Sequence, residues 1–205
     1  MKVIAVNASP HPDGNTAFAL HLVLKELEAE GIETEILQLG GKTIRDCIGC
    51  NGCSKLDGKC IFKDDIVNEW SEKMAQADGI LIGTPVYYSG ISGTLKCFLD
   101  RVFYSNGKAF RHKIAASVAA VRRTGGMPAL DDINRFFTIS EMIQPASSYW
   151  NVIHGQKPGE AEQDIEGCQI MQVLGKNMAW LLKMRQESTL EEPQRQAKKP
   201  MNFIH

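Results

Sequence analysis

The hydrophobic pattern of this chain changes period several times, and each change predicts a new strand or helix. Residues 2–7 form a short apolar run rich in β-branched side chains, which is typical of a buried strand. A polar turn follows, and apolar residues then recur at helical spacing. The apolar face of this helix holds Leu20, Val23, Leu24 and Leu27. A strand, a turn and a helix in this order make half of a βαβ unit.

The alternation of strand and helix patterns continues along the chain. Further strands are predicted at residues 32–39, 79–84, 113–121 and 147–153. Further helices are predicted at residues 64–76, with Asp64 or Asp65 as cap, and at 94–103, 129–143 and 165–185. Residues 32–39 alternate between polar and apolar positions, as an edge strand does. Five strands with helices between them predict an α/β fold, a three-layer sandwich around a parallel sheet.

The length of 205 residues fits one domain. Residues 1–185 carry the periodic segments and include an irregular, cysteine-rich loop at 40–63. Residues 186–205 form a polar tail with two prolines and the pair Lys198-Lys199. We expect this tail to be loosely held or to pack on a neighbouring subunit.

The composition narrows the class of protein. A net charge of −1 argues against binding to nucleic acid or to an anionic membrane, and 43% hydrophobic residues fit a globular protein. No apolar run approaches the ~20 residues that span a bilayer, and no signal peptide precedes the first strand. We therefore expect a cytoplasmic protein. In that reducing compartment the six cysteines favour metal ligands or redox groups over structural disulfides.

The turn from Ser9 to Thr16 is a candidate phosphate site. It offers hydroxyl and amide side chains, Gly14, and the N–H groups of a starting helix. The turn lacks the glycine pattern of dinucleotide folds and the Gly-Lys-Ser/Thr of nucleotide triphosphatases. A monophosphate held by hydroxyls and backbone amides fits these residues best. The alternative is an ordinary loop in which Asn15 or Thr16 caps the helix.

Two more loops have unusual composition. The loop after the third strand places Tyr87 and Tyr88 between glycines, where the rings can cover a flat ligand or simply the edge of the core. The loop after the fourth strand pairs Arg122 and Arg123 with Gly125-Gly126, which suits an anion or a ring, although the arginines also fit a solvated surface. Because ligands bind beyond the carboxyl ends of parallel strands, we expect these loops to face one site with the first turn.

Three motifs carry a resemblance to a known family. They are Ser9-Pro10-His11 through Gly14-Asn15-Thr16, Pro85-Val86-Tyr87-Tyr88-Ser89-Gly90, and Leu95-Lys96-Cys97-Phe98-Leu99-Asp100-Arg101. In order and spacing, over residues 1–183, the chain resembles the NADPH-dependent FMN reductase family of flavodoxin-like proteins. The resemblance implies a five-stranded parallel sheet in the order 2-1-3-4-5, bound FMN, and a homo-oligomer, a dimer or tetramer.

The resemblance also implies roles for single residues. The FMN phosphate would lie on Ser9, His11, Asn15 and Thr16. The isoalloxazine ring would lie against Pro85, Val86, Tyr87, Tyr88 and Ser89. The far edge of the ring would meet Arg122, Thr124, Gly125 and Gly126. No catalytic side chain is required, because the flavin carries the redox chemistry and NAD(P)H can stack on it transiently as donor.

Four cysteines are closely spaced in the irregular loop. Two, two and six residues separate Cys47, Cys50, Cys53 and Cys60, and glycines lie between them. Such a loop can wrap a cubane cluster with one thiolate on each iron. The spacing resembles that of the iron–sulfur flavoproteins, a branch of the same family with a [4Fe–4S] cluster near the flavin. Zinc, which usually takes two separated pairs, and free thiols or a redox pair remain alternatives.

Other polar residues receive structural roles. We expect Asp100 and Arg101 to pair with each other or with helix ends. Cys97 and Cys168 fit core positions. His154, after the fifth predicted strand, either approaches the ring or lies on the surface.

These features predict a flavin oxidoreductase that passes electrons between FMN and a cluster. One alternative is an NAD(P)H:FMN, quinone or other small-molecule reductase without a cluster. Others are a non-enzymatic carrier like flavodoxin and a redox or metal sensor. The electron donor or acceptor would be a small molecule or a protein.

Overall fold

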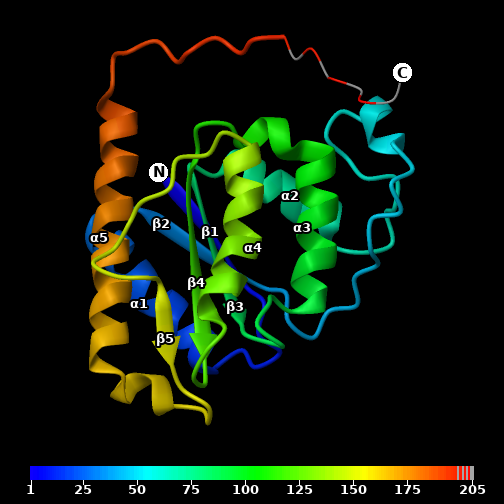
Figure 1. Ribbon diagram of the computed structural model, residues 1–205. Coiled ribbons are helices and arrows are strands. Elements are labelled where there is room, and N and C mark those ends of the chain that lie inside the picture. The colour runs from blue at the N-terminus through cyan, green and yellow to red at the C-terminus, as the bar shows by residue number, and fades with distance from the viewer. Residues whose placement is uncertain (198, 200, 202, 204–205) are drawn as a thin grey trace.

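A parallel sheet of five strands runs through the middle of the molecule (Figure 1) in the computed structural model, which describes residues 1–197, 199, 201 and 203. Its strands are β1 (Lys2–Asn7), β2 (Glu33–Gln38), β3 (Gly79–Pro85), β4 (Ile114–Val121) and β5 (Val152–His154). All neighbours pair in parallel, and the order is β2-β1-β3-β4-β5. The predicted fold and strand order are confirmed.

Helices cover both faces of the sheet (Figure 1). One face packs against α1 (Asn15–Ala29) and α5 (Ile165–Glu187), and the other against α2 (Val67–Gln76), α3 (Gly93–Asn106) and α4 (Gly126–Ile139). Along β1, Val3 and Ala5 face α1 and α5, whereas Ile4 and Val6 face the other layer. Burial on both faces explains the continuous apolar run of this strand. In the described part of the chain, no helix is both long enough and apolar enough to cross a membrane.

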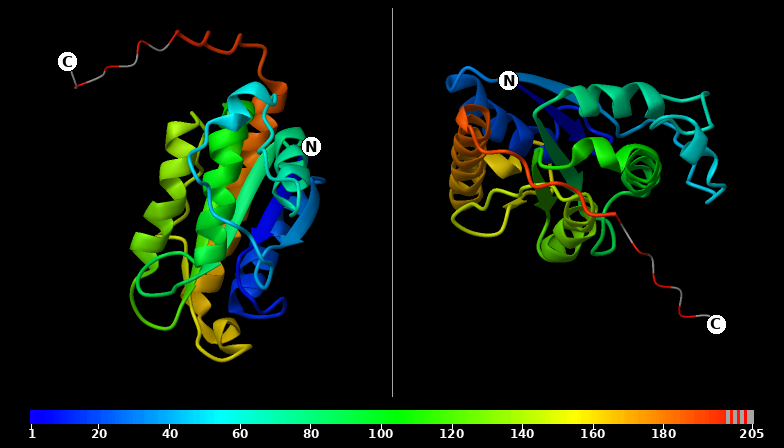
Figure 2. Two further views of the ribbon diagram at one scale, coloured as in Figure 1. Left: turned by 90° about the vertical axis from the view of Figure 1, so that its right-hand side faces the viewer. Right: turned by 90° about the horizontal axis from the view of Figure 1, so that it is seen from above.

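The cysteine-rich loop leaves the sheet after β2 and lies along the outer side of α3 (Figure 2). It contains the short 3₁₀ helix η1 (Gly52–Lys55), which contacts α3. Two further 3₁₀ turns, η2 (Gly107–Phe110) and η3 (Glu160–Gln163), follow α3 and precede α5. The loop is thus an addition to one helical layer rather than a part of the sheet.

The last strand is shorter than predicted. Residues 147–151 are irregular, and only Val152–His154 pair with β4. The Ser147 hydroxyl lies within hydrogen-bond distance of the Tyr149 carbonyl and of Oδ1 of Asn151, and can donate its one proton to either. The Asn151 side chain donates to the Ser117 carbonyl at 3.0 Å. These local polar contacts replace the strand ladder over residues 147–151.

Several helix boundaries also differ from the prediction. α4 begins after Gly125, whose φ of 90° turns the chain, and ends at Ile139 rather than at residue 143. Glu141 then takes a left-handed conformation and the chain folds back on the helix end. α2 begins at Val67, later than expected, although the Asp65 carboxylate still accepts the Val67 N–H at 3.1 Å.

The tail follows α5, which ends at Glu187, and no helix or strand occurs in its described residues. Its first part is held by polar contacts. Glu192 contacts Arg185 and His112, and Arg111 donates to the Pro193 carbonyl at 2.8 Å. Lys198 and Pro200 of the predicted tail lie outside the described residues. Packing on a neighbouring subunit stays a prediction.

A buried polar frame fixes the first turn to the ends of β1 and β2. The fully buried Asn7 donates from its side chain to Oε1 of Gln38 at 2.7 Å and accepts the Ser9 N–H at 3.1 Å. Gln38 in turn donates to the Ser9 carbonyl at 2.7 Å. Gly40 lies so close that a Cβ atom there would stand 1.9 Å from the Ser9 carbonyl oxygen. The position of the turn therefore depends on these residues.

Asp164 caps the start of α5. Its carboxylate accepts the Gly167 N–H at 2.9 Å and the His154 N–H at 2.7 Å, and His154 Nδ1 lies 3.0 Å from the same carboxylate. Partial burial acts to raise the pKa of Asp164, but these hydrogen bonds together outweigh it and lower the pKa overall. One carboxylate therefore ties the end of β5 to α5.

Replacing Gly40 by alanine should destabilise the protein. The new methyl group meets backbone atoms of Ser9, which can move only with the whole turn, so we expect a loss of about 1–3 kcal/mol in the free energy of unfolding. Gly93→Ala is the control, because no atom lies within 4 Å of its Cβ position and alanine favours helix by up to about 1 kcal/mol. Denaturant unfolding measures both variants. Equal stability of the two variants would contradict the claim that the close approach of Gly40 to Ser9 fixes the first turn.

Asp164→Asn should destabilise the protein at pH 7 by about 1 kcal/mol, since asparagine still caps a helix but accepts weaker hydrogen bonds than a carboxylate. The lowered pKa means that the charge contributes fully above the unfolded-state pKa of about 3.9, and its contribution disappears as the pH falls through the folded-state value. The free energy of unfolding of Asp164→Asn should therefore be lower than that of the unmodified protein at pH 7, and this difference should shrink at pH 3. The exposed Asp131→Asn serves as control. A difference independent of pH would refute the role of the charge.

Candidate functional site

The loops after β1, β3 and β4 meet at the carboxyl edge of the sheet, as predicted. They enclose an open pocket of about 410 Å³, within the size range of cofactor sites. The predicted site residues that line it are Ser9, His11, Asn15, Thr16, Pro85, Val86, Tyr87 and Arg122. Gly155, Gln156 and Pro158 complete the wall, and the sequence pattern alone did not identify them.

The first turn presents hydrogen-bond donors to this pocket. The Ser9 side chain is buried, and its hydroxyl oxygen accepts the His11 N–H at 3.2 Å. The first bond of α1 runs from the Phe18 N–H to the Gly14 carbonyl at 3.0 Å, so the three N–H groups of residues 15–17 precede it. Thr16 is buried beside them. A helix start with these groups attracts an anion through its dipole and its N–H donors.

Asn15 has a different geometry from the one expected of a side-chain phosphate ligand. Its Nδ2 donates to the Lys157 carbonyl at 3.0 Å, and its Oδ1 accepts the Ala161 N–H at 3.3 Å. Gly155 packs against this side chain so closely that a Cβ atom would lie 2.8 Å from Nδ2. The side chain thus fastens residues 155–161 beside the pocket.

The loop after β3 is a tight turn. Tyr87 and Gly90 exchange two backbone hydrogen bonds of 3.0 Å, and Tyr88 and Ser89 both have left-handed φ angles of 50° and 60°. Tyr87 lines the pocket, whereas the Tyr88 side chain is fully exposed at the tip. Only the first of the two tyrosines therefore forms part of the pocket wall.

The loop after β4 divides its residues between two neighbouring pockets. Arg122 lines the first pocket, while Thr124, Gly125 and Gly126 line a second of about 270 Å³. Gly125 approaches the previous loop, since a Cβ atom there would lie 2.8 Å from the Ser89 hydroxyl oxygen. Tyr149, Trp150 and His154 form other walls of the second pocket. Gly125 also packs against Val86 of the first pocket, since a Cβ atom there would lie 3.1 Å from that side chain.

The four loop cysteines come together at a separate place. Cys47, Cys50, Cys53 and Cys60 all line one small cavity of about 20 Å³ between the loop and the C-terminal half of α3. Burial, reinforced by the negative charge that the other three thiols can carry, raises the pKa of the Cys53 thiol. Since metal ligation requires thiolates, binding of a metal would have to release protons from this cluster of thiols.

The four loop thiols do not form a preorganised site for a single metal ion. Within the residues that the structure describes, no three histidine, cysteine or acidic side chains are arranged around one metal ion. A tetrahedral zinc with bonds of about 2.3 Å draws its four sulfurs close together, whereas a cubane takes one thiolate on each of its irons.

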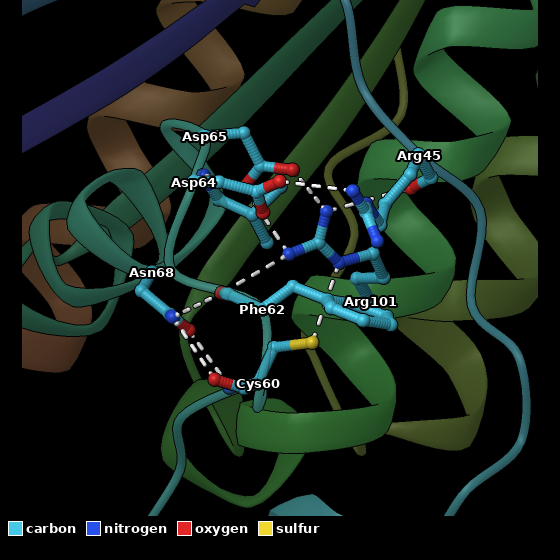
Figure 3. A network of polar contacts seen from close by, with 8 residues as sticks. Arg45, Cys60, Phe62, Asp64, Asp65, Asn68 and Arg101 are labelled. Carbon is cyan, nitrogen blue, oxygen red and sulfur yellow. Dashed lines mark hydrogen bonds and ion pairs between the residues drawn. The ribbon is translucent and has the colours of Figure 1, made fainter.

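Arg101 corrects one prediction and adds a residue to this region (Figure 3). It does not pair with Asp100, which instead contacts Lys96 on the same helix at 2.5 Å. Arg101 is 1% exposed and forms an ion pair with Asp65, which lies two residues before α2. Its Nε–H donates to Sγ of Cys60 at 3.3 Å. The prediction missed this contact because it joins residues that are far apart in the sequence.

Of the two other cysteines, Cys168 packs against the core as expected, whereas Cys97 is partly exposed and belongs to neither core cluster. Cys97 lies on α3 and Cys168 on α5. Burial raises the pKa of both thiols. They lie outside the cavity that the loop cysteines share.

The sequence profile of NADPH-dependent FMN reductases matches residues 1–157. An iron–sulfur flavoprotein of Methanocaldococcus jannaschii is 39% identical over 90% of this chain and 98% of its own length. A second iron–sulfur flavoprotein from that organism is 34% identical over 83% of this chain and 91% of its own.

Among solved structures, RosB with a bound riboflavin-phosphate intermediate has a TM-score of 0.68 at 16% identity, covering 100% of this chain and 92% of RosB. This likeness supports the flavodoxin-like fold. The sequence matches establish the family as well as the fold. The family profile covers residues 1–157, and the two iron–sulfur flavoproteins align over nearly their whole lengths. The chain therefore belongs to the NADPH-dependent FMN reductase family, on its iron–sulfur flavoprotein branch, and is an FMN-dependent oxidoreductase.

Proposed function

We propose that this protein passes electrons between FMN at the carboxyl edge of the sheet and a [4Fe–4S] cluster in the Cys47–Cys60 loop. The observation that carries the proposal is that four cysteines of one loop line a single cavity in a chain of an FMN-dependent family. The names of the similar iron–sulfur flavoproteins support it. Bound FMN supplies hydride and electron transfer, and a cluster supplies single-electron transfer.

The phosphate of FMN is assigned to the first turn. The Ser9 and Thr16 hydroxyls, His11 and the N–H groups at the start of α1 are the donors, and the helix dipole adds a favourable field. Asn15 contributes its N–H, while its side chain holds residues 155–161 as the outer wall. One phosphate-sized turn favours FMN over a dinucleotide cofactor.

The isoalloxazine ring is assigned to the second and third loops. Pro85, Val86 and Tyr87 form the inner wall of the pocket, and the strained turn at Tyr88 and Ser89 presents backbone groups beside it. Arg122, Thr124, Gly125 and Gly126 would meet the far edge of the ring. Because Gly125 lines the second pocket and packs against Val86 of the first, a donor or acceptor in the second pocket, beside Tyr149 and Trp150, would reach that edge.

The cluster is assigned to the four loop cysteines. Their cavity now has room for about one water, so binding requires the exposed part of the loop to move outward from α3. Few packing contacts oppose this movement, because most residues of the loop are exposed. Cys60 is the fixed end, since Arg101 and Asn68 both hold it.

The two sites lie at different levels of α3. Ser92 caps this helix beside the first pocket, and Arg101 stands nine residues later, which is roughly 14 Å along the axis at 1.5 Å per residue. The centres would therefore not touch within one chain. A dimer or tetramer, as proposed from the family, would bring loops of neighbouring chains together. The partners would be a small molecule such as NAD(P)H, or an electron-transfer protein, in the cytoplasm.

A reductase without a cluster is the second candidate. The family is described as NADPH-dependent FMN reductase, and that activity needs only the flavin pocket. In this case NAD(P)H would reduce FMN, which would pass the electrons to free flavin, a quinone or another small molecule. The cysteines would then act as thiols.

The double variant Ser9→Ala/Thr16→Ala should weaken FMN binding at least a hundredfold. Two hydrogen bonds to a charged phosphate are lost, at about 1.5–3 kcal/mol each. The exposed Thr138→Ala, far along α4, should bind as the unmodified protein does. Fluorescence titration of the apoprotein measures the dissociation constants. Undiminished affinity in the double variant would remove the phosphate assignment.

After anaerobic purification and reconstitution, the protein should contain about four iron and four acid-labile sulfide per chain. Serine at Cys47, Cys50, Cys53 and Cys60 should abolish both, while the matched double variant Cys97→Ser/Cys168→Ser should retain them. FMN content should stay near one per chain throughout, because the flavin pocket is separate. A folded, FMN-loaded protein without iron would leave the cluster-free reductase as the function.

A further inference from the structure

Arg101 is a buried cation in the layer of helices that carries the cysteine loop. Its side chain has no exposed surface, and its carboxylate partner Asp65 is nearly buried as well. Nη1 and Nη2 both donate to this carboxylate, which makes the pair bidentate. A charge removed from water is costly unless every donor finds an acceptor, so the remaining contacts of the guanidinium are informative.

Those contacts all go to the cysteine loop. Nη1 also donates to the Arg45 carbonyl and Nη2 to the Phe62 carbonyl, both at 3.4 Å, while Nε donates to Sγ of Cys60 at 3.3 Å. A guanidinium has five N–H groups, and here five contacts engage it. Arg45 precedes the first cysteine of the loop and Phe62 follows the last. One side chain thus holds both ends of the segment that carries the four thiols (Figure 3).

Cys60 is fixed from a second direction by Asn68 of α2. The Cys60 N–H donates to Oδ1 of Asn68 at 2.7 Å, and Nδ2 of Asn68 donates to the Cys60 carbonyl at 3.0 Å. The same Nδ2 donates to the Phe62 carbonyl at 2.9 Å. The backbone and the sulfur of Cys60 are therefore both restrained by the helices behind the loop.

We propose that Arg101 is a positioning residue for the cluster, one that presents Cys60 as a preformed ligand and raises the reduction potential. This inference rests on the proposed cluster. A hydrogen bond to a ligating sulfur and a nearby positive charge both favour the reduced cluster, which carries one more negative charge after gaining one electron. Arginine suits the task because its planar fork binds Asp65 and still leaves Nε–H for sulfur.

The experiment compares three variants after anaerobic reconstitution. Arg101→Gln removes the cation and the hydrogen bond. Arg101→Lys keeps the charge beside Asp65 but lacks the fork that also reaches Cys60. Arg45→Gln is the matched control, since it removes an exposed arginine that stacks on Phe62 at 4.5 Å and pairs with Asp64, without a side-chain contact to a thiol. The readouts are FMN and iron per chain, and the cluster potential from a dithionite titration with mediators.

We expect the equilibrium constant for reduction of the cluster to be about tenfold lower in Arg101→Gln, which lowers the reduction potential by about 59 mV for a one-electron couple. Arg101→Lys should show a smaller fall and lose iron to a chelator several times faster than the unmodified protein. Arg45→Gln should match the unmodified protein in both properties. If Arg101→Gln does not fold, as judged by lost FMN, Arg101→Lys decides.

Unchanged potential and iron retention in the folded Arg101 variants would overturn the inference while leaving the cluster in place. An equal shift in Arg45→Gln would also overturn it, because any nearby charge would then suffice. An unmodified protein that binds FMN but no iron would instead overturn the proposed cluster, and the inference with it.

Discussion

The parallel direction of all five strands is the constraint on which the flavin site depends. Each connection has to cross a face of the sheet, and every carboxyl end then lies at the same edge. The turn after β1, the tyrosine turn after β3 and the glycine pair after β4 are therefore brought together without any contact specific to a ligand. The Asn7–Gln38 hydrogen bond and the close approach of Gly40 add precision, because they lock the first turn to two strand ends.

The cysteine loop follows a different principle. It follows β2 but runs away from the sheet edge, and its place is set by a buried ion pair on the helical layer. Arg101 supplies the charge, Asp65 neutralises it, and the spare donors of the guanidinium bind the two ends of the loop. A largely exposed loop with one anchored cysteine suits the proposed site, which must open to admit a cluster. The proposed flavin and cluster sites are thus built on separate loops, one at the sheet edge and one along the C-terminal half of α3.

The sequence predicted most of this architecture because the buried strands are continuous apolar runs and the helices repeat their apolar residues at helical spacing. β1, β3 and β4 are buried on both faces, so their apolar runs define them. The failures occurred where local polar contacts decide the structure. Ser147 and Asn151 turn a β-like segment into a loop, and the left-handed Gly125 starts α4 early. No pattern in the sequence pairs Arg101 with Asp65 and Cys60, or Asn15 with Lys157 and Ala161, because these contacts depend on the packing of separate elements.

The central claim is that one chain holds two redox centres, a flavin at the sheet edge and a cluster on α3. The most direct test is an anaerobic reductive titration of the reconstituted protein that counts the electrons taken up per bound FMN. The account predicts uptake of about three electrons, two by the flavin and one by the cluster. Uptake of about two electrons, with the flavin fully bleached, would contradict the account and leave FMN as the single redox centre.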